Sequence, residues 1–194
     1  MLWKAHLSEM AASAAAAAEQ AGESVEAAAR LVADAVLSGR KVLAFGNGGS
    51  AAQAQHLAAE LVVRYRDDRR ALPAVSLTTD TSILTACAND YDFSRVFARQ
   101  VEALGAPGDV AFGLSTSGTS PNVVAALEAA RARGLATVLV TGEKGRDAAA
   151  RWDVGVVLPS TETAHVQELT LAVLHVVCRH VDEELARRDG AQRR

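Results

Sequence analysis

The feature that most constrains the fold of this 194-residue chain is an alternation of short apolar runs with longer helical stretches. The runs are rich in β-branched residues and are predicted to be strands, at residues 41–45, 74–78, 109–115, 136–140 and 154–159. Helices are predicted between them, and a long one from about Thr163 to Arg188. Apolar strands separated by helices indicate an α/β fold of three layers, with a central parallel sheet of five strands. Ligands are then expected at the carboxyl ends of the strands.

The N-terminal segment, about residues 1–38, is predicted to be helical. It contains "AASAAAAAEQ", and alanine is the best helix former. The helical stretch runs from about Trp3 to Leu37, breaks near Gly22 and ends at Gly39. We expect this segment and the alternating part to form a single domain over residues 1–194, because the length suits one core and no boundary is visible.

Composition points to a small partner rather than a polymer or a membrane. Hydrophobic residues make up 49% and the formal net charge is -3, which favours neither disorder nor non-specific nucleic-acid binding. Cys87 and Cys178 lie in apolar segments, as buried thiols do in a reducing compartment. The sequence shows neither an export signal nor the ~18–20 apolar residues of a membrane span. We therefore expect a cytoplasmic protein.

Two loops are predicted to bind an anion. In "FGNGGSAAQ" the glycines allow a tight turn from strand to helix, and Ser50 is the expected N-cap. In "STSGTSPN", residues 115–122, Ser120 is the expected N-cap and Pro121 the first helical residue. Hydroxyls, backbone N–H groups and the helix dipole there suit a phosphate monoester. Either loop alone is also compatible with a purely structural turn, and the spacings of dinucleotide and P-loop motifs are absent, which disfavours a nucleotide-binding enzyme.

Four polar residues on two predicted helices are candidates for chemistry. His56 and Glu60 are four residues apart and share one helix face. Gln167 and His175 are eight apart on the long C-terminal helix, about 80° around its axis, so they can line adjoining walls of a pocket. An exposed polar pair and a buried core histidine are the plainer alternatives. In a cleft, a carboxylate and an imidazole suit a general base and acid.

Taken together, these motifs resemble the sugar isomerase (SIS) domain family, and within it the phosphoheptose isomerases. The resemblance covers most of the chain and rests on "GNGGS", "QHLAAEL" followed by "RYR", "AND" at 88–90, "STSGTS", and "VQE" with the later His175. It implies a flavodoxin-like SIS fold and an aldose–ketose isomerase that converts D-sedoheptulose 7-phosphate to D-glycero-D-manno-heptose 7-phosphate for heptose biosynthesis. A non-catalytic SIS adaptor, which binds a phosphosugar or the replication initiator, is the alternative; the presence of both Glu60 and His175 favours the enzyme.

The resemblance also implies roles for individual residues. Glu60 and His175 match the acid/base pair. A zinc ion, one per subunit, would be held by His56, Glu60, Gln167 and His175. The substrate-binding positions are Asn47, Gly48, Gly49, Ser50, Glu60, Asn89, Asp90, Ser115, Thr116, Ser117, Ser120 and Gln167.

Two further implications concern the oligomeric state and one residue that differs from the family pattern. The family forms homotetramers with active sites at subunit interfaces, and the apolar N- and C-terminal helices are expected to pack between subunits. His165 stands where many members have arginine, so a charge contact at the pocket mouth is in question for this chain.

Overall fold

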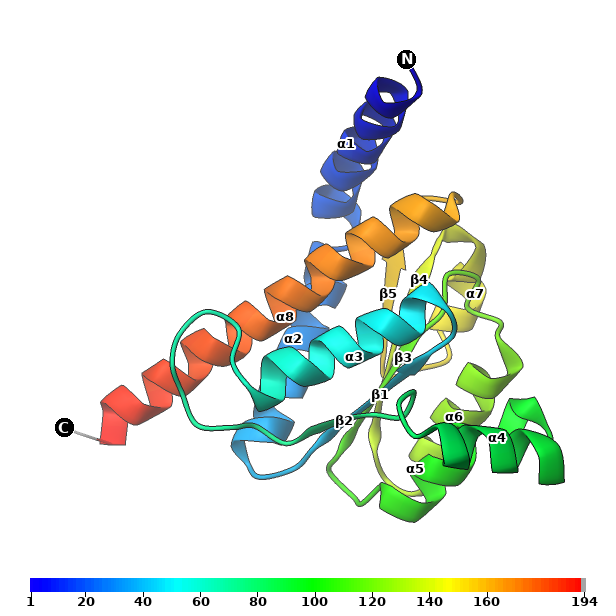
Figure 1. Cartoon of the computed structure of the whole chain (residues 1–194). Helices are drawn as coiled ribbons and strands as arrows, with labels where there is room; N and C mark the ends of the chain where they lie inside the picture. Colours follow the sequence, from blue (N-terminus) through cyan, green and yellow to red (C-terminus); the bar gives the residue numbers. More distant parts are fainter. Residues whose placement is uncertain (193–194) are drawn as a thin grey trace.

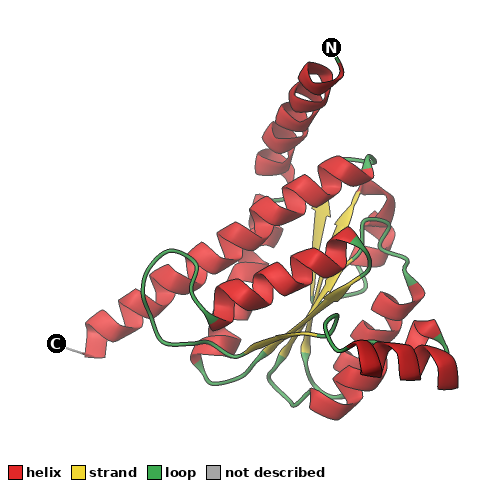
Figure 2. Ribbon diagram, in the orientation of Figure 1, coloured by secondary structure: helices red, strands yellow, loops and turns green. Residues whose placement is uncertain are grey.

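The computed structural model describes residues 1–192 and contains a five-stranded parallel sheet between two helical layers (Figure 1; Figure 2). The strand order is β2-β1-β3-β4-β5, and all neighbouring strands run parallel. The predicted α/β class, the three layers and the five parallel strands are confirmed. The strands are β1 (Val42–Gly46), β2 (Ala74–Ser76), β3 (Val110–Leu114), β4 (Ala136–Gly142) and β5 (Val154–Leu158).

The helices occupy the segments before, between and after the strands. The N-terminal stretch breaks at Ala21, as the sequence predicts near Gly22, and the C-terminal helix is the longest. The α-helices are α1 (Leu2–Gln20), α2 (Gly22–Leu37), α3 (Gly49–Val62), α4 (Thr81–Asp90), α5 (Ala98–Leu104), α6 (Pro121–Ala132), α7 (Arg146–Ala149) and α8 (Thr163–Gln192). Two short 3-10 turns are η1 (Phe93–Arg95) and η2 (Glu143–Gly145).

Side-chain alternation along the strands divides the core into two halves. Successive residues of a strand point to opposite faces of the sheet. Val42 and Ala44 of β1 therefore pack with α2, α3 and α8, whereas Leu43 and Phe45 pack with α5 and α6. All five residues of β1 are buried. This double burial is the reason that the strands are apolar throughout rather than alternating.

The neighbouring strands β1 and β3 mark the point where the chain changes direction across the sheet. The helix after β1, α3, packs on one face, and the helix after β3, α6, packs on the other. In doubly wound sheets of this order, ligands bind in the crevice at such a switch point, beside the carboxyl ends of the strands. The loops predicted to bind an anion follow these two strands.

The prediction that Ser50 caps α3 is wrong. The helix begins one residue earlier, at Gly49, and its N-cap is Gly48. Gly48 has φ 55°, in the left-handed region that glycine adopts without a steric penalty. Ser50 is instead buried within the first turn.

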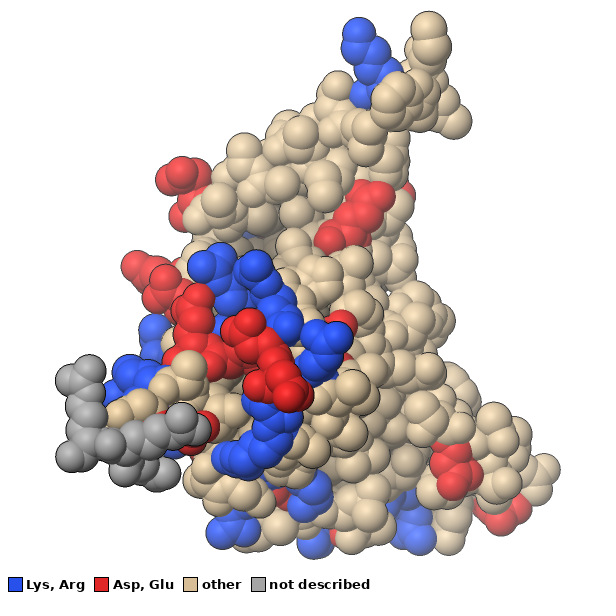
Figure 3. Space-filling model, turned by 60° about the vertical axis from the view of Figure 1, so that its left-hand side comes forward, with Lys and Arg blue, Asp and Glu red and all other residues tan. Residues whose placement is uncertain are grey.

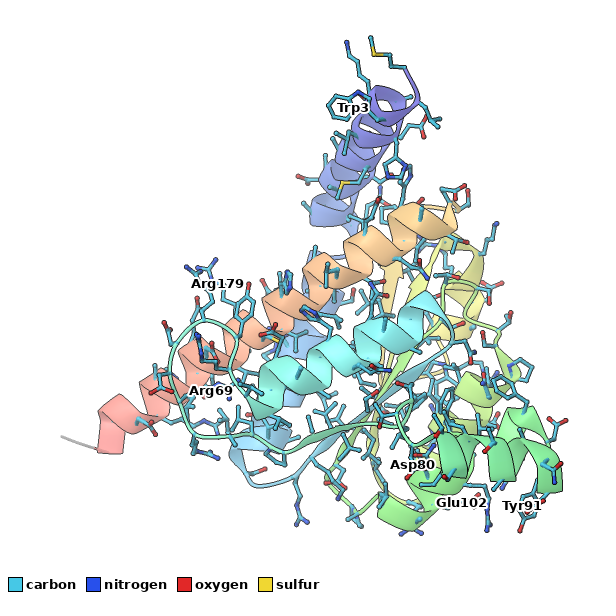
Figure 4. All side chains as sticks on the ribbon, viewed as in Figure 1. Trp3, Arg69, Asp80, Tyr91, Glu102 and Arg179 are labelled. Carbon is cyan, nitrogen blue, oxygen red and sulfur yellow. The ribbon has the colours of Figure 1, made fainter. Side chains whose placement is uncertain are left out.

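Helix α1 projects beyond the sheet and its helical layers (Figure 1), while Ala14 and Ala17 near its end pack against the core. None of its residues is buried. It exposes Leu2, Trp3 and Leu7, and Trp3 lies near its free end in Figure 4. Within residues 1–192, no helix combines the length and the apolar character that crossing a bilayer requires.

Candidate active site

The two loops that are predicted to bind an anion lie side by side at the switch point. Gly46 at the end of β1 is in register with Leu114 at the end of β3. Just beyond them, the amides of Asn47 and Asn122 exchange two hydrogen bonds of 2.8 Å each. The amide pair joins the glycine loop to the first turn of α6. Asn122 was not among the predicted site residues, although its position directly after Pro121 places it at a helix start.

The hydroxyl loop opens toward the N-terminus of α6. Ser120 is the N-cap and Pro121 the first helical residue, as predicted. The Ser120 hydroxyl makes no capping bond; it lies 3.0 Å from the Ser115 hydroxyl instead. Ser117 Oγ accepts from the backbone N–H and the hydroxyl of Thr119, at 3.3 and 3.2 Å. The loop therefore gathers hydroxyls beside the positive end of a helix, an arrangement suited to an anion.

Of the predicted loop residues, Thr116 also has a structural role. Its carbonyl accepts a hydrogen bond from the N–H of Gly142, at 3.2 Å, and so links the loop to the end of β4. Its neighbour Ser115 is buried. The base of the loop is thus fixed by the sheet, and the hydroxyls of Ser117 and Thr119 lie farther out.

His56, a predicted zinc ligand, lies between the two residues of the predicted acid/base pair. Its Nε2 lies 3.3 Å from Glu60 Oε1 and 3.2 Å from His175 Nε2. The His175 ring stacks on Tyr65, with ring centroids 5.5 Å apart. Helices α3 and α8 pack against each other along this seam, and each contributes one imidazole. The structure therefore brings together the three residues, as the sequence predicts.

A buried ion pair holds the end of α3 beside this group. Arg69 Nε lies 2.7 Å from Asp182 Oδ1, and both side chains are buried. The same guanidinium donates to the Glu60 carbonyl at 2.8 Å. In Figure 4 the Arg69 side chain lies between its loop and α8. The backbone that carries Glu60 is thus tied to α8 by charge-assisted hydrogen bonds.

Cys178 lies one turn beyond His175 on α8, and its thiol has low reactivity. It is fully buried and forms no disulfide. Burial, followed by the nearby Glu60 carboxylate, raises the pKa of its thiol to about 12. Cys87 is also buried and free. Both cysteines are therefore buried and unpaired, as the sequence predicts.

Gln167 lies near the glycine loop rather than beside His175. The Gln167 amide lies so close to Gly49 that a Cβ added there would push it aside. The Gln167 carbonyl accepts from Gln53 Nε2 of α3 at 2.6 Å. Eight residues of helix place Gln167 about 12 Å from His175 along α8, at 1.5 Å per residue. The predicted residues therefore form a line along the α3–α8 seam rather than a single cluster.

Asn89 and Asp90 are not brought to this seam. They lie exposed at the end of α4, where Asn89 Nδ2 donates to Asp90 Oδ1 at 2.8 Å. Helix α4 packs mainly against η1. Figure 4 shows Tyr91, the next residue, at the edge of the molecule far from α8. Within one chain, these two residues are separate from His56, Glu60 and His175.

The four predicted zinc ligands suit the metal in donor type, but only two of their spacings fit a zinc site. Among the described side chains, His56, Glu60 and His175 do not form a group whose ligand atoms all lie within 4.8 Å of one another. Zinc accepts imidazole nitrogen and carboxylate oxygen, and Zn–N bonds of ~2.0–2.1 Å place two tetrahedral ligands about 3.3 Å apart. His56 Nε2 has Glu60 and His175 at 3.3 and 3.2 Å. Gln167 would have to turn from Gly49 to complete the set.

His165 occupies an unexpected environment for a residue at a pocket mouth. It is only 4% exposed, and its ring packs on His6 of α1 at a centroid distance of 4.7 Å. His6 in turn lies 2.6 Å from Glu168. No sequence pattern predicts this contact, because the partners are about 160 residues apart.

Comparison with known proteins agrees with the fold and the motifs. Residues 5–142 match the SIS domain family. The phosphoheptose isomerase of Geobacter sp. (strain M21) is 51% identical over 161 residues, which are 83% of this chain and 84% of that protein. That of Alteromonas mediterranea is 45% identical over 185 residues, 94% of this chain and 93% of that protein.

A solved structure leads to the same family. The phosphoheptose isomerase of Neisseria gonorrhoeae superposes with a TM-score of 0.88 at 41% identity, over 94% of this chain and 100% of that one. The relatives are isomerases, so the comparisons favour the enzyme over the non-catalytic adaptor. From its motifs, its fold and these relatives, the chain belongs to the SIS-domain phosphoheptose isomerase family and is an enzyme.

Proposed function

We propose that this isomerase converts D-sedoheptulose 7-phosphate to D-glycero-D-manno-heptose 7-phosphate, a step of heptose biosynthesis. The observation that carries the proposal is the contact of His56 Nε2 with both Glu60 and His175. A protein that only binds a phosphosugar has no chemical need for a carboxylate and two imidazoles in contact. The names of its close relatives support the same substrate class.

The substrate phosphate would bind in the loop of residues 115–120. This loop presents hydroxyls and the N-terminus of α6, and a phosphate monoester accepts hydrogen bonds from both. The sugar would extend over the glycine loop, where Asn47 and the exposed backbone of Gly48 and Gly49 can meet its hydroxyls. Ser50, Asn89, Asp90 and Gln167 stay predicted substrate contacts.

The reaction moves one proton between carbons and one between oxygens. Glu60 acts as the base: its carboxylate removes a proton from C1 of the open-chain ketose, and the C2 carbonyl becomes part of an enediol. Glu60 then returns this proton to C2, while the proton on the C1 oxygen leaves as the C1 carbonyl forms. His175 acts as the acid: it donates a proton to the C2 oxygen and recovers one from the C1 oxygen.

We propose one zinc ion per subunit, held by His56, Glu60, Gln167 and His175. When bound, the ion would polarise the carbonyl oxygen of the sugar. Because the ion would share Glu60 and His175 as ligands, it would reduce the role of His175 as a free acid. His56 lies 3.3 Å from Glu60 and 3.2 Å from His175 and so can orient both of them.

We also propose a cytoplasmic homotetramer with active sites at subunit interfaces. Glu60 follows Gly49 by eleven residues, which is about 16 Å along α3. The acid/base residues of one chain thus lie well away from its own glycine loop. Asn89 and Asp90 lie on another element, at the end of α4, whose neighbour Tyr91 is at the edge of the molecule (Figure 4). Because the predicted site residues of one chain are this far apart, residues from a second copy would be needed to complete the active site. The two buried free thiols suit a reducing compartment.

The test is to incubate the purified protein with sedoheptulose 7-phosphate and to follow the sugar by NMR. Appearance of the C1 aldehyde and hemiacetal signals of the seven-carbon aldose phosphate supports the proposal. An unchanged spectrum, in a protein whose binding of the ketose is confirmed by titration, would mean that the residues bind the sugar without isomerising it.

A further inference from the structure

A second group of metal-ligating side chains lies where α1 meets the start of α8. It consists of His6, His165 and Glu168, whose ligand atoms all lie within 4.8 Å of one another. In residues 1–192 it is the one group of three histidine, cysteine or acidic residues that meets this condition. His165 and Glu168 are three residues apart and so share a face of α8. His6 approaches them from α1.

Two atoms of this group are buried without a hydrogen-bond partner. They are Nε2 of His165 and Oε2 of Glu168. His165 is 4% exposed, so water does not replace the missing partner over most of its surface. Buried polar atoms are nearly always paired, and an exception needs a physical cause. The 2.6 Å contact between His6 and Glu168 does not explain the unpaired Oε2, because His6 contacts the other carboxylate oxygen, Oε1.

A single cation would satisfy both atoms. Two imidazoles and a carboxylate form a donor set that suits zinc and related divalent ions, with a fourth position left for water. To bind the ion, His6 Nε2 would give up its 2.6 Å contact with Glu168 Oε1 and turn toward His165 Nε2 and Glu168 Oε2. The His6 side chain is partly exposed, which leaves room for this turn.

This group is distinct from the seam that carries His56 and His175. Gln167 faces α3 through Gln53 and Gly49, whereas Glu168, the next residue, faces α1. Successive residues of a helix are about 100° apart around its axis. The two groups thus lie on different sides of α8.

We propose that His6, His165 and Glu168 form a second divalent metal site, of the zinc class, which fastens α1 to the first turns of α8. The ion supplies a cross-link for a helix that has no fully buried side chain and whose packing on the core is by small residues, Ala14 and Ala17. The site is structural. It positions the N-terminal helix and takes no part in the proton transfers.

The test starts from the full chain carrying His56→Ala and His175→Ala, which removes two donors of the other proposed site. After dialysis against micromolar zinc and removal of unbound metal, this parent should retain one zinc per chain by elemental analysis. Adding His6→Ala should lower the zinc affinity, measured by competition with a chromophoric chelator, at least about tenfold, since loss of even an outer partner of a ligand costs 10- to 100-fold. His6 is partly exposed, so this change leaves the core intact.

His180→Ala is the matched control, because His180 lies on α8 outside the group. It should leave the affinity unchanged. If the parent fails to fold, the otherwise unchanged chain is compared with its His6→Ala form, whose zinc content should fall by one ion per chain. Equal affinity in the His6→Ala and His180→Ala proteins overturns the proposal. So does a folded parent that retains no zinc, which would leave a His6–Glu168 ion pair alone.

Discussion

At the scale of single residues, Glu60 has the most exacting task in the proposed reaction. It must carry a proton between two carbons, so its charge matters more than its shape. We predict that Glu60→Gln will bind sedoheptulose 7-phosphate but will lose at least about 100-fold in rate, the lower range for general-base catalysis. In D₂O the unchanged enzyme should incorporate deuterium at the transferring carbon, as NMR can follow. Exchange at the same rate in the variant would exclude Glu60 as the base.

The hydroxyl loop gives the second prediction. Ser120 pairs with Ser115, and Ser117 pairs with Thr119, so both hydroxyls are held near the start of α6. Replacing Ser117 and Ser120 by alanine should raise KM for the phosphosugar about tenfold or more, since each lost hydrogen bond to a charged group is worth ~1.5–3 kcal/mol. Circular dichroism should be unchanged. An unaltered KM would place the phosphate elsewhere.

The parts of the candidate site that depend on neighbouring residues in the sequence could be predicted. Ser120 and Pro121 indicate a helix start, because serine is favoured at the N-cap and proline at the first helical position. His56 and Glu60 share a face because they are four residues apart on a helix. The cap of α3 was missed because a positive φ at Gly48 outweighs the capping tendency of Ser50. The His6–Glu168 contact depends on how α1 packs on α8, which no local pattern encodes.

At the scale of elements, Asp109 fixes the start of β3 against β1. Its carboxylate accepts from the Lys41 N–H at 3.0 Å, the Lys41 ammonium at 2.5 Å and the Ala106 N–H at 2.8 Å. Burial alone would raise the pKa of Asp109, but these hydrogen bonds, chiefly that of the Lys41 side chain, hold it below the ordinary 3.8. The ionised carboxylate is therefore favoured in the folded state.

We predict that Asp109→Asn will lower the free energy of unfolding by about 1–3 kcal/mol at neutral pH. A depressed folded-state pKa stabilises above the unfolded value of 3.8 and loses its effect as pH falls through the folded value. The difference between variant and unchanged protein, measured by urea unfolding, should thus shrink below pH 3.8. Exposed Asp68→Asn is the control and should show neither effect. A difference that stayed constant with pH would contradict this account.

Most strands and helices could be predicted, because a strand that is buried on both faces appears in the sequence as a continuous apolar run. The strands β1 and β3 are buried at every position, so their apolar runs are continuous. Strand β2 is shorter than predicted: it ends at Ser76, and the chain turns before α4 begins at Thr81. As an edge strand, β2 is paired on one side only, which relaxes the constraint on its length.

At the scale of the whole molecule, charged side chains are unevenly distributed on the face that Figure 3 shows. Figure 3 shows acidic and basic side chains crowded at one end, whereas the projecting helix above is mostly uncharged. A groove of about 350 Å³ lies along α1, α2 and α8, and its lining is almost wholly apolar: Ala14, Ala17, Ala18, Ala21, Gly22, Val25, Glu26, Leu158, Leu169, Ala172, Val173 and Val176. An apolar groove beside an exposed apolar helix favours burial between subunits.

The last prediction concerns this surface. Light scattering at micromolar concentration should give a mass four times that of the 20.2-kDa chain, and a monomer would remove the proposed assembly. Val176 is 46% exposed beside the groove, so Val176→Glu would place a charge in an apolar interface and should shift the mass toward smaller species. Because the site is proposed to need a second copy, the rate per chain should fall together with the tetramer and recover at higher protein concentration. Ala103→Glu, on the opposite helical layer, should change neither quantity. A fully active Val176→Glu monomer would show that one chain completes its own site.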